Sequence, residues 1–353
     1  MDQWGPTDPR SREADPSAPS SSVPSGSSDV PLLPARDAVV LPHDPSAAHH
    51  PIAGPTVSAE VPFDDDEEDT RPSVLVPAVL FVLTVFTTLW AGAYNAGGTG
   101  GRGPWQFLVD NPWGLLRGIP FAATLLGILV THEFGHYFMS RVHRVPATLP
   151  LFIPGPPHFI GTFGAIIRMR PILNRKALFD IGVAGPIAGF VVAVLALAVG
   201  LGLSRVIDRE SSYGLQLGEP LLLQFMSWLI IGPLPARADV LLHPIAFAAW
   251  FGLFVTALNL IPIGQLDGGH VAYALWGPMQ RRIALVAVPI LLVLGVIGWP
   301  GWFLWVGMAS FMGVSHPPVL DMHEELGRTR VWIGRAALAI FLLSFAPIPF
   351  SVG

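Results

Sequence analysis

The stretch His132-Glu133-Phe134-Gly135-His136 lies inside a long apolar run and decides how the rest of the chain is interpreted. The H-E-x-x-H pattern is typical of zinc hydrolases when it lies on a helix. Two histidines four residues apart differ by only about 40° around a helix, so both imidazoles can bind one metal ion. Glu133 projects to nearly the same side, where it can reach a metal-bound water.

The apolar run around this pattern, residues 119–139, contains no charged residue except Glu133. Roughly 20 apolar residues are enough to span a bilayer as a helix. A carboxylate at that depth is costly and needs a partner, which a zinc ion would supply. The alternative interpretation is that His132 and His136 are buried structural histidines. The intervening glutamate and the membrane setting disfavour it.

The composition is that of a membrane protein with several spans. Of the 353 residues, 51% are hydrophobic and only 13% are charged. The net charge of −5 owes much to the acidic run at 64–69, and no basic surplus suggests nucleic-acid binding. Cysteine is absent, which excludes disulfides and thiolate ligands, so any metal must be held by nitrogen and oxygen.

Residues 1–73 are rich in Pro and Ser and contain the acidic run, so we expect a disordered tail. No cleavable signal peptide is visible at the start of the sequence. The rest, residues 74–348, is expected to form an all-α membrane domain of about six to seven helices. The candidate spans are 74–94, 119–139, 178–203, 243–263, 283–297, 302–314 and 331–345, with a possible interfacial or re-entrant helix at 221–234.

The loops between these spans differ in charge. One side of the predicted bundle carries twelve Lys and Arg residues and the other carries five. The positive-inside rule therefore places the N-terminal tail in the cytoplasm and the H-E-x-x-H pattern in the cytoplasmic half of its helix.

Residues 147–175 are too polar and too rich in Pro and Gly to form another span. The segment 159–170 mixes β-branched and aromatic residues and follows the breaker Pro154-Gly155-Pro156-Pro157. It predicts a short strand or hairpin at the cytoplasmic membrane surface. An ordinary amphipathic connector is the open alternative.

A hydrolytic zinc site needs a third protein ligand besides the two histidines. The segment 259–270 stands out because Pro262 ends or kinks the preceding helix and three glycines let the chain unwind. Asp267 is then carried near the cytoplasmic side, at the depth of the histidines. His270 is the rival ligand, and an ordinary Asx-type turn at Asp267 is the structural alternative.

These motifs together resemble the site-2 protease family of intramembrane zinc metalloproteases, in particular its bacterial and plastid branch. The resemblance covers residues 74–348. It is carried by H-E-F-G-H at 132–136, N-L-I-P-I-G-Q-L-D-G-G at 259–269, G-T-F-G-A-I at 161–166, A-G-P-I-A-G at 184–189, and H-P-P at 316–318 with Asp321.

The resemblance implies that His132, His136 and Asp267 are zinc ligands and that Glu133 is the general base. It also implies that Asn259 holds the substrate backbone or the developing oxyanion, although an asparagine there could instead link helices. The strand near 159–167 matches the family's membrane-embedded sheet, to which an unwound substrate would add a strand.

Two further features have structural interpretations. Gly182, Gly185 and Gly189 predict a small-residue face that packs against the H-E-x-x-H helix. Asp180, close to Arg175 and Lys176, is interpreted as a charge at a helix N-terminus or at the membrane interface.

The sequence thus predicts an intramembrane endopeptidase with one zinc ion that cuts a transmembrane, regulatory protein near the cytoplasmic face of a bacterial inner or cell membrane. The alternatives are a catalytically silent relative that acts as a membrane chaperone or scaffold and, least favoured, a metal transporter. The connection 204–242 is too short for an inserted domain of typical size, so substrate selection is expected to rest on the loops, the sheet or the tail.

Overall fold

The computed structural model describes residues 74–97, 103–208, 215–235 and 237–352. The predicted tail at 1–73 and its acidic run lie outside the described residues. The described chain is mostly helical, as expected. Its helices are α1 (Leu75–Asn95), α2 (Pro104–Asp110), the 3-10 helix η1 (Pro112–Gly118), α3 (Ile119–Val142), α4 (Arg175–Gly202), α5 (Leu221–Ile230), α6 (Pro244–Asn259), α7 (Asp267–Trp276), α8 (Met279–Ile297), α9 (Gly301–Met312) and α10 (Gly327–Ser344).

Four helices are long and apolar enough to cross a membrane: α1, η1 continued by α3, α4, and α8. They coincide with the predicted spans 74–94, 119–139, 178–203 and 283–297. The other predicted spans correspond to the shorter apolar helices α6 and α9 and to α10. Four spans are therefore confirmed by length and composition, and a total of six to seven stays a prediction.

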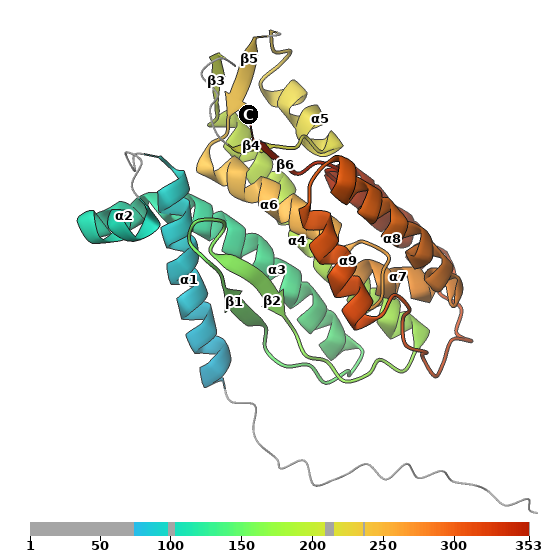
Figure 1. Ribbon diagram of the computed structural model, residues 1–353. Coiled ribbons are helices and arrows are strands. Elements are labelled where there is room, and N and C mark those ends of the chain that lie inside the picture. The colour runs from blue at the N-terminus through green and yellow to red at the C-terminus, as the bar shows by residue number, and fades with distance from the viewer. Residues whose placement is uncertain (1–73, 98–102, 209–214, 236, 353) are drawn as a thin grey trace, which may run out of the picture. The chain divides into compact units, whose positions relative to one another are not determined.

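The centre of the bundle is formed by α3, α4 and α6, which lie side by side in Figure 1. These helices contribute most of the largest fully buried side chains, among them Trp250 and Phe251 of α6. On one side of this centre lie α1 and a small sheet, and on the other lie α7, α8 and α9 (Figure 1). Apolar side chains on the outer faces of α1 and α8 are exposed, as lipid-facing surfaces require.

A two-stranded antiparallel sheet follows α3. Strands β1 (Leu151–Pro154) and β2 (Thr162–Ile166) pair with Leu151 opposite Ile166, and the register shifts between Ile153 and Pro154. The breaker segment at 154–157 thus begins the turn that joins the strands, and β2 falls within the predicted strand. Association of this sheet with a membrane surface stays a prediction.

Helix α1 holds the turn between β1 and β2. Thr87 Oγ1 donates to the Gly161 carbonyl at 2.6 Å, and Asn95 Nδ2 donates to the Phe159 carbonyl at 2.9 Å. Gly161 has a φ of +77° and its Cα lies against the backbone of α1, so a side chain has no room there. The sheet is therefore fixed to α1.

Two further strand pairs lie at one end of the bundle (Figure 1). Strand β3 (Arg205–Asp208) pairs with β5 (Ala238–Leu241), and β4 (Leu215–Leu217) pairs with β6 (Phe350–Val352), both antiparallel. Phe350 of β6 packs on the rings of Trp250 and Phe251, so the C-terminal segment is anchored to α6.

Candidate metal centre

The two histidines of the H-E-x-x-H pattern lie one turn apart on α3 and point the same way. Both are buried, and their Nε2 atoms are 3.2 Å from each other. His136 Nδ1 is 2.8 Å from the carbonyl oxygen of Ile181 in α4. A carbonyl can only accept, so Nδ1 carries the proton and His136 Nε2 is left with a free lone pair. A ligating histidine is commonly oriented by such a bond.

Asp267, the first residue of α7, meets this pair from a distant part of the chain. Its Oδ2 lies 3.2 Å from His132 Nε2 and 3.4 Å from His136 Nε2. The chain reaches this position because α6 ends at Asn259 and α7 begins only at Asp267, with Pro262 in the intervening turn. The predicted interruption of the helix near Pro262 is therefore confirmed.

These three side chains form a group that could hold a metal ion. A tetrahedral zinc ion with ligand bonds of about 2.0–2.2 Å separates its ligands by about 3.3–3.5 Å. The separations of 3.2, 3.2 and 3.4 Å among the three donor atoms fit that geometry.

Two of the three glycines predicted to pack against the H-E-x-x-H helix do so, whereas Gly182 faces α7 instead. A Cβ atom on Gly185 would overlap the His136 imidazole, and one on Gly189 would crowd His132 at 3.1 Å. A Cβ on Gly182 would come within 2.9 Å of His270 Cβ. Small residues therefore let α4 approach closely enough for the Ile181 carbonyl to reach His136.

Glu133 and Asn259, the predicted catalytic residues, also lie at this group. Glu133 is 7% exposed, and no hydrogen bond from the described residues reaches its carboxylate. Asn259 Nδ2 lies 3.3 Å from His132 Nε2. The structure thus brings all five predicted site residues together. Among the described residues, the buried Glu133 carboxylate has no hydrogen-bond partner that would explain its presence.

His270, the rival ligand, has another partner. Its Nδ1 is 2.7 Å from His316 Nε2, and His316 Nδ1 is 2.6 Å from the Pro317 carbonyl. Burial lowers the pKa of His270 to about 4, so the ring is neutral near pH 7. The donor group contains Asp267 and not His270. The H-P-P segment at 316–318 is thereby linked to α7.

Sequence reasoning missed Gln280, a buried residue at the start of α8. Its amide Nε2 donates to the carbonyls of Pro262 and Val314 at 3.1 and 3.2 Å, and its Oε1 accepts from the His316 backbone N–H at 3.1 Å. Gln280 therefore holds the turn that precedes Asp267 against the segment that contains His316. A lone glutamine at the edge of a predicted span gave no signal of this role.

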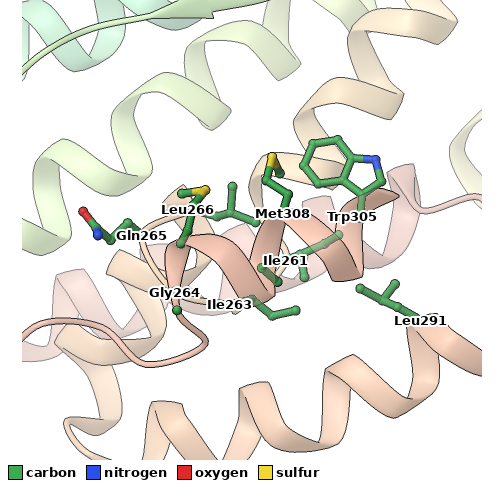
Figure 2. A pocket seen from close by; sticks show the side chains of 11 residues that line it. Ile261, Ile263, Gly264, Gln265, Leu266, Leu291, Trp305 and Met308 are labelled. Atoms are coloured by element: carbon green, nitrogen blue, oxygen red, sulfur yellow. The ribbon is translucent and has the colours of Figure 1, made fainter. Parts of the chain in front are cut away.

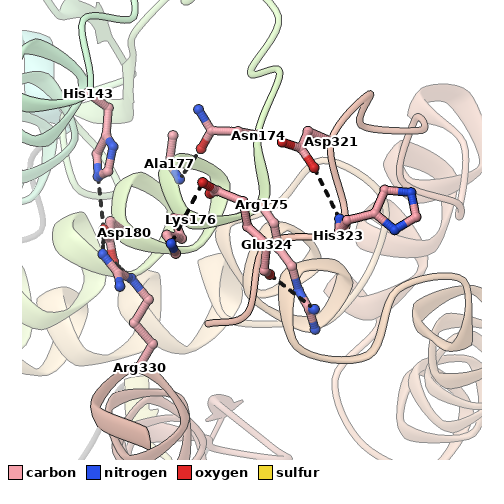
Figure 3. Close-up of polar contacts among 10 residues, drawn as sticks. All are labelled: His143, Asn174, Arg175, Lys176, Ala177, Asp180, Asp321, His323, Glu324 and Arg330. Carbon is pink, nitrogen blue, oxygen red and sulfur yellow. Dashed lines mark hydrogen bonds and ion pairs between the residues drawn. The ribbon is translucent and has the colours of Figure 1, made fainter. Parts of the chain in front are cut away.

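It also missed the partners of Asp180. This carboxylate binds Arg330 of α10 through both oxygens, at 2.8 and 2.7 Å, and His143 Nε2 at 2.8 Å (Figure 3). His143 is the C-cap of α3, so Asp180 ties α3, α4 and α10 together one residue before the Ile181 carbonyl. Lys176 instead pairs with Glu324 at 3.7 Å. The interpretation of Asp180 as a charge at the helix N-terminus or interface was therefore incomplete.

An apolar pocket adjoins the turn between α6 and α7. Figure 2 shows Ile261, Ile263 and Leu266 of the turn facing Trp305 and Met308 of α9. Gln265 is the only lining residue with a polar side chain apart from the Trp305 indole. The pocket therefore offers an apolar surface next to the turn that leads to Asp267.

The comparisons with known proteins identify the family of this chain. The chain matches the family model described as "Peptidase family M50" over residues 120–297, a range that contains the H-E-x-x-H pattern and Asp267. The chain therefore belongs to this family, the site-2 protease family. It is a mostly helical membrane protein of a peptidase family.

Two relatives are plant proteins. The chain is 33% identical over 239 residues to "Probable zinc metalloprotease EGY1, chloroplastic" from Arabidopsis thaliana, covering 65% of this chain and 43% of that protein. It is 32% identical over 253 residues to "Probable zinc metalloprotease EGY2, chloroplastic" from Oryza sativa subsp. indica, covering 68% and 45%. The chain thus spans less than half the length of these curated relatives. No solved structure matches it.

Proposed function

We propose that this protein is an intramembrane zinc endopeptidase that hydrolyses a peptide bond within or near a transmembrane segment. The observation that carries the proposal is the convergence of His132, His136 and Asp267 beside the buried carboxylate of Glu133, on a helix of membrane-spanning length. Family membership and the zinc metalloproteases among the relatives support it.

The three donors would hold zinc through two imidazole nitrogens and one carboxylate oxygen, the donor set of many hydrolytic zinc sites. Bound zinc polarises a carbonyl group and lowers the pKa of water towards about 7. The Ile181 carbonyl keeps His136 in the tautomer whose Nε2 can bind.

Glu133 would act as the general base. Its carboxylate accepts a proton from the attacking water and returns it to the nitrogen of the leaving amine. It is free for that role because no described residue donates to it. Asn259 would donate its amide N–H to the substrate carbonyl oxygen, on which negative charge develops.

The substrate would be a membrane segment in extended form, since a helix hides its own amides and carbonyls. Within the described residues β2 pairs only with β1, so its other edge is available for an added strand. The family resemblance favours a membrane-anchored regulatory protein as the substrate.

The site is proposed to face the cytoplasmic side, because the Lys and Arg residues concentrate in the loops at that end. A bacterial inner membrane remains our expectation for the location, while the names of the plant relatives carry the word chloroplastic. A silent scaffold is the competing function, and the unpartnered Glu133 argues against it.

The test compares membranes that contain the wild type or Glu133→Gln. Newly formed N-termini are labelled and identified by mass spectrometry. We expect cleavage sites inside or beside transmembrane segments in the wild type and none with the variant, although both proteins bind zinc. Equal cleavage in both would refute the role of Glu133, and zinc binding without any cleavage would favour the scaffold.

A further inference from the structure

An open cavity of about 450 Å³ lies at the end of α7 opposite to Asp267. Its walls come from three segments: Arg175 at the start of α4, Leu275 near the end of α7, and residues from Glu325 to Arg335 in and before α10. The volume falls in the usual range for small-molecule sites, about 300–1,000 Å³. None of these residues belongs to the metal centre.

The cavity is basic. Arg175, Arg328 and Arg335 line it, and Glu325 is the only carboxylate among its lining residues. Arg175 donates to the Ala274 and Leu275 carbonyls at 2.6 and 3.1 Å. It also donates to the Glu324 carbonyl at 3.4 Å, as Figure 3 shows. These acceptors are uncharged, so none of them neutralises the guanidinium.

The other two arginines are exposed. No hydrogen bond or ion pair from the described residues reaches Arg328. Arg335 lies over the Trp332 ring, with its guanidinium carbon 4.4 Å from the ring centroid. A cation–π contact holds the cation in place without cancelling its charge. Two guanidinium groups therefore remain available to an anion.

An apolar stripe continues from this cavity along α10. Residues at helical positions i, i+4, i+7 and i+11 share a face, so Val331 and Arg335 are followed on one side by Leu338 and Leu342. Leu338 is 51% exposed and Leu342 is 55% exposed. Trp332, 65% exposed at the mouth of the cavity, is the residue type that prefers the membrane interface.

We propose that this cavity binds the phosphate headgroup of an anionic phospholipid. Arg328 and Arg335 bind the phosphate oxygens, and an acyl chain lies along Leu338 and Leu342. Basic pockets between membrane helices bind anionic headgroups in this way, and α10 overlaps the predicted span 331–345. A soluble phosphate compound offers the same headgroup chemistry, but only a lipid uses the apolar stripe.

The test uses the full-length protein, purified and stripped of lipid in a neutral detergent. Binding of phosphatidylglycerol, phosphatidylcholine and glycerol 3-phosphate is measured by native mass spectrometry and titration. The test variant is Arg328→Gln with Arg335→Gln. The matched control, Arg281→Gln with Arg282→Gln, removes the same charge from exposed positions of α8 outside the cavity.

We expect the wild type and the control to prefer phosphatidylglycerol over phosphatidylcholine. The double variant should bind phosphatidylglycerol at least about tenfold more weakly. If the double variant does not fold, as judged by zinc content and thermal unfolding, the single substitution Arg328→Glu at an exposed position should show the same loss.

Three results would overturn the proposal. They are equal binding of the two lipids by the wild type, unchanged phosphatidylglycerol binding in variants that fold, and glycerol 3-phosphate binding as tight as that of the lipid. The last result would assign the cavity to a soluble phosphate. None depends on protease activity, so the lipid site and the proposed function can fail separately.

Discussion

Gly185 of α4 lies so close to His136 that a Cβ atom at this position would overlap the imidazole ring. The same helix supplies the Ile181 carbonyl that fixes the tautomer of His136. The orientation of His136 therefore depends on the close packing of α4 against α3. The small-residue face of α4 has a chemical role as well as a structural one.

Gly185→Ala should accordingly weaken zinc binding, because the methyl group must displace the His136 ring or push α4 away. We expect the zinc affinity, measured by competition with a chelator of known affinity, to fall by about 10–100-fold. Gly127→Ala is the matched control, since Gly127 lies in α3 with nothing within 4 Å of an added Cβ. Unaltered zinc affinity in Gly185→Ala would contradict the geometry described for α4.

Asp180→Asn should destabilise the bundle, because it removes the charge that Arg330 and His143 share. The side chain of Asp180 is only 16% exposed and that of Arg330 is 30% exposed, so we expect a loss of about 1–3 kcal/mol in thermal unfolding. Glu324→Gln breaks the Lys176–Glu324 pair, whose side chains are 37% and 40% exposed, and should cost less than about 1 kcal/mol. Equal effects of the two substitutions would show that Asp180 does not tie the helices together.

Gln280→Glu should loosen the turn that carries Asp267 while it keeps the shape of the side chain. The substitution replaces the amide donor, which leaves the carbonyls of the half-buried residues Pro262 and Val314 without that bond. Each such loss costs about 1–3 kcal/mol. We expect lower thermal stability together with weaker zinc binding. Lower stability with normal zinc affinity would mean that Gln280 does not position Asp267.

Removal of residues 1–70 should leave one zinc ion bound per chain. All three donor residues and the groups that orient them lie between residues 74 and 352. The zinc content of the truncated protein, measured beside that of the full chain, checks this expectation. A truncated protein that folds but lacks zinc would refute it.

Much of the fold could be predicted because apolar length and glycine or proline breaks are local properties of the sequence. The four longest helices coincide with predicted spans, and the helix break before Asp267 coincides with Pro262 and its neighbouring glycines. Gly185 and Gly189 also indicated the face of α4 that packs against α3, whereas Gly182 packs against α7. These signals require no knowledge of distant contacts.

The parts of the fold and of the site that were not predicted depend on tertiary contacts between residues far apart in the sequence. Asp180 has Arg175 and Lys176 as its neighbours in sequence, yet it binds Arg330, 150 positions away. Gln280 binds backbone carbonyls, and because every residue has a carbonyl, no pattern of residue types indicates such a contact. Strand β1 precedes the proline-rich breaker, so its pairing with β2 was not evident from the composition of the later segment.

The most direct test of this account is the zinc content of the purified protein, measured beside His136→Ala and Asp267→Ala. Because three protein ligands are required to hold the ion, we predict about one zinc per chain in the wild type and loss of zinc in both variants. Zinc retained without Asp267 would contradict the donor group described here. No zinc in the wild type, even after zinc is added, would contradict the proposed enzyme.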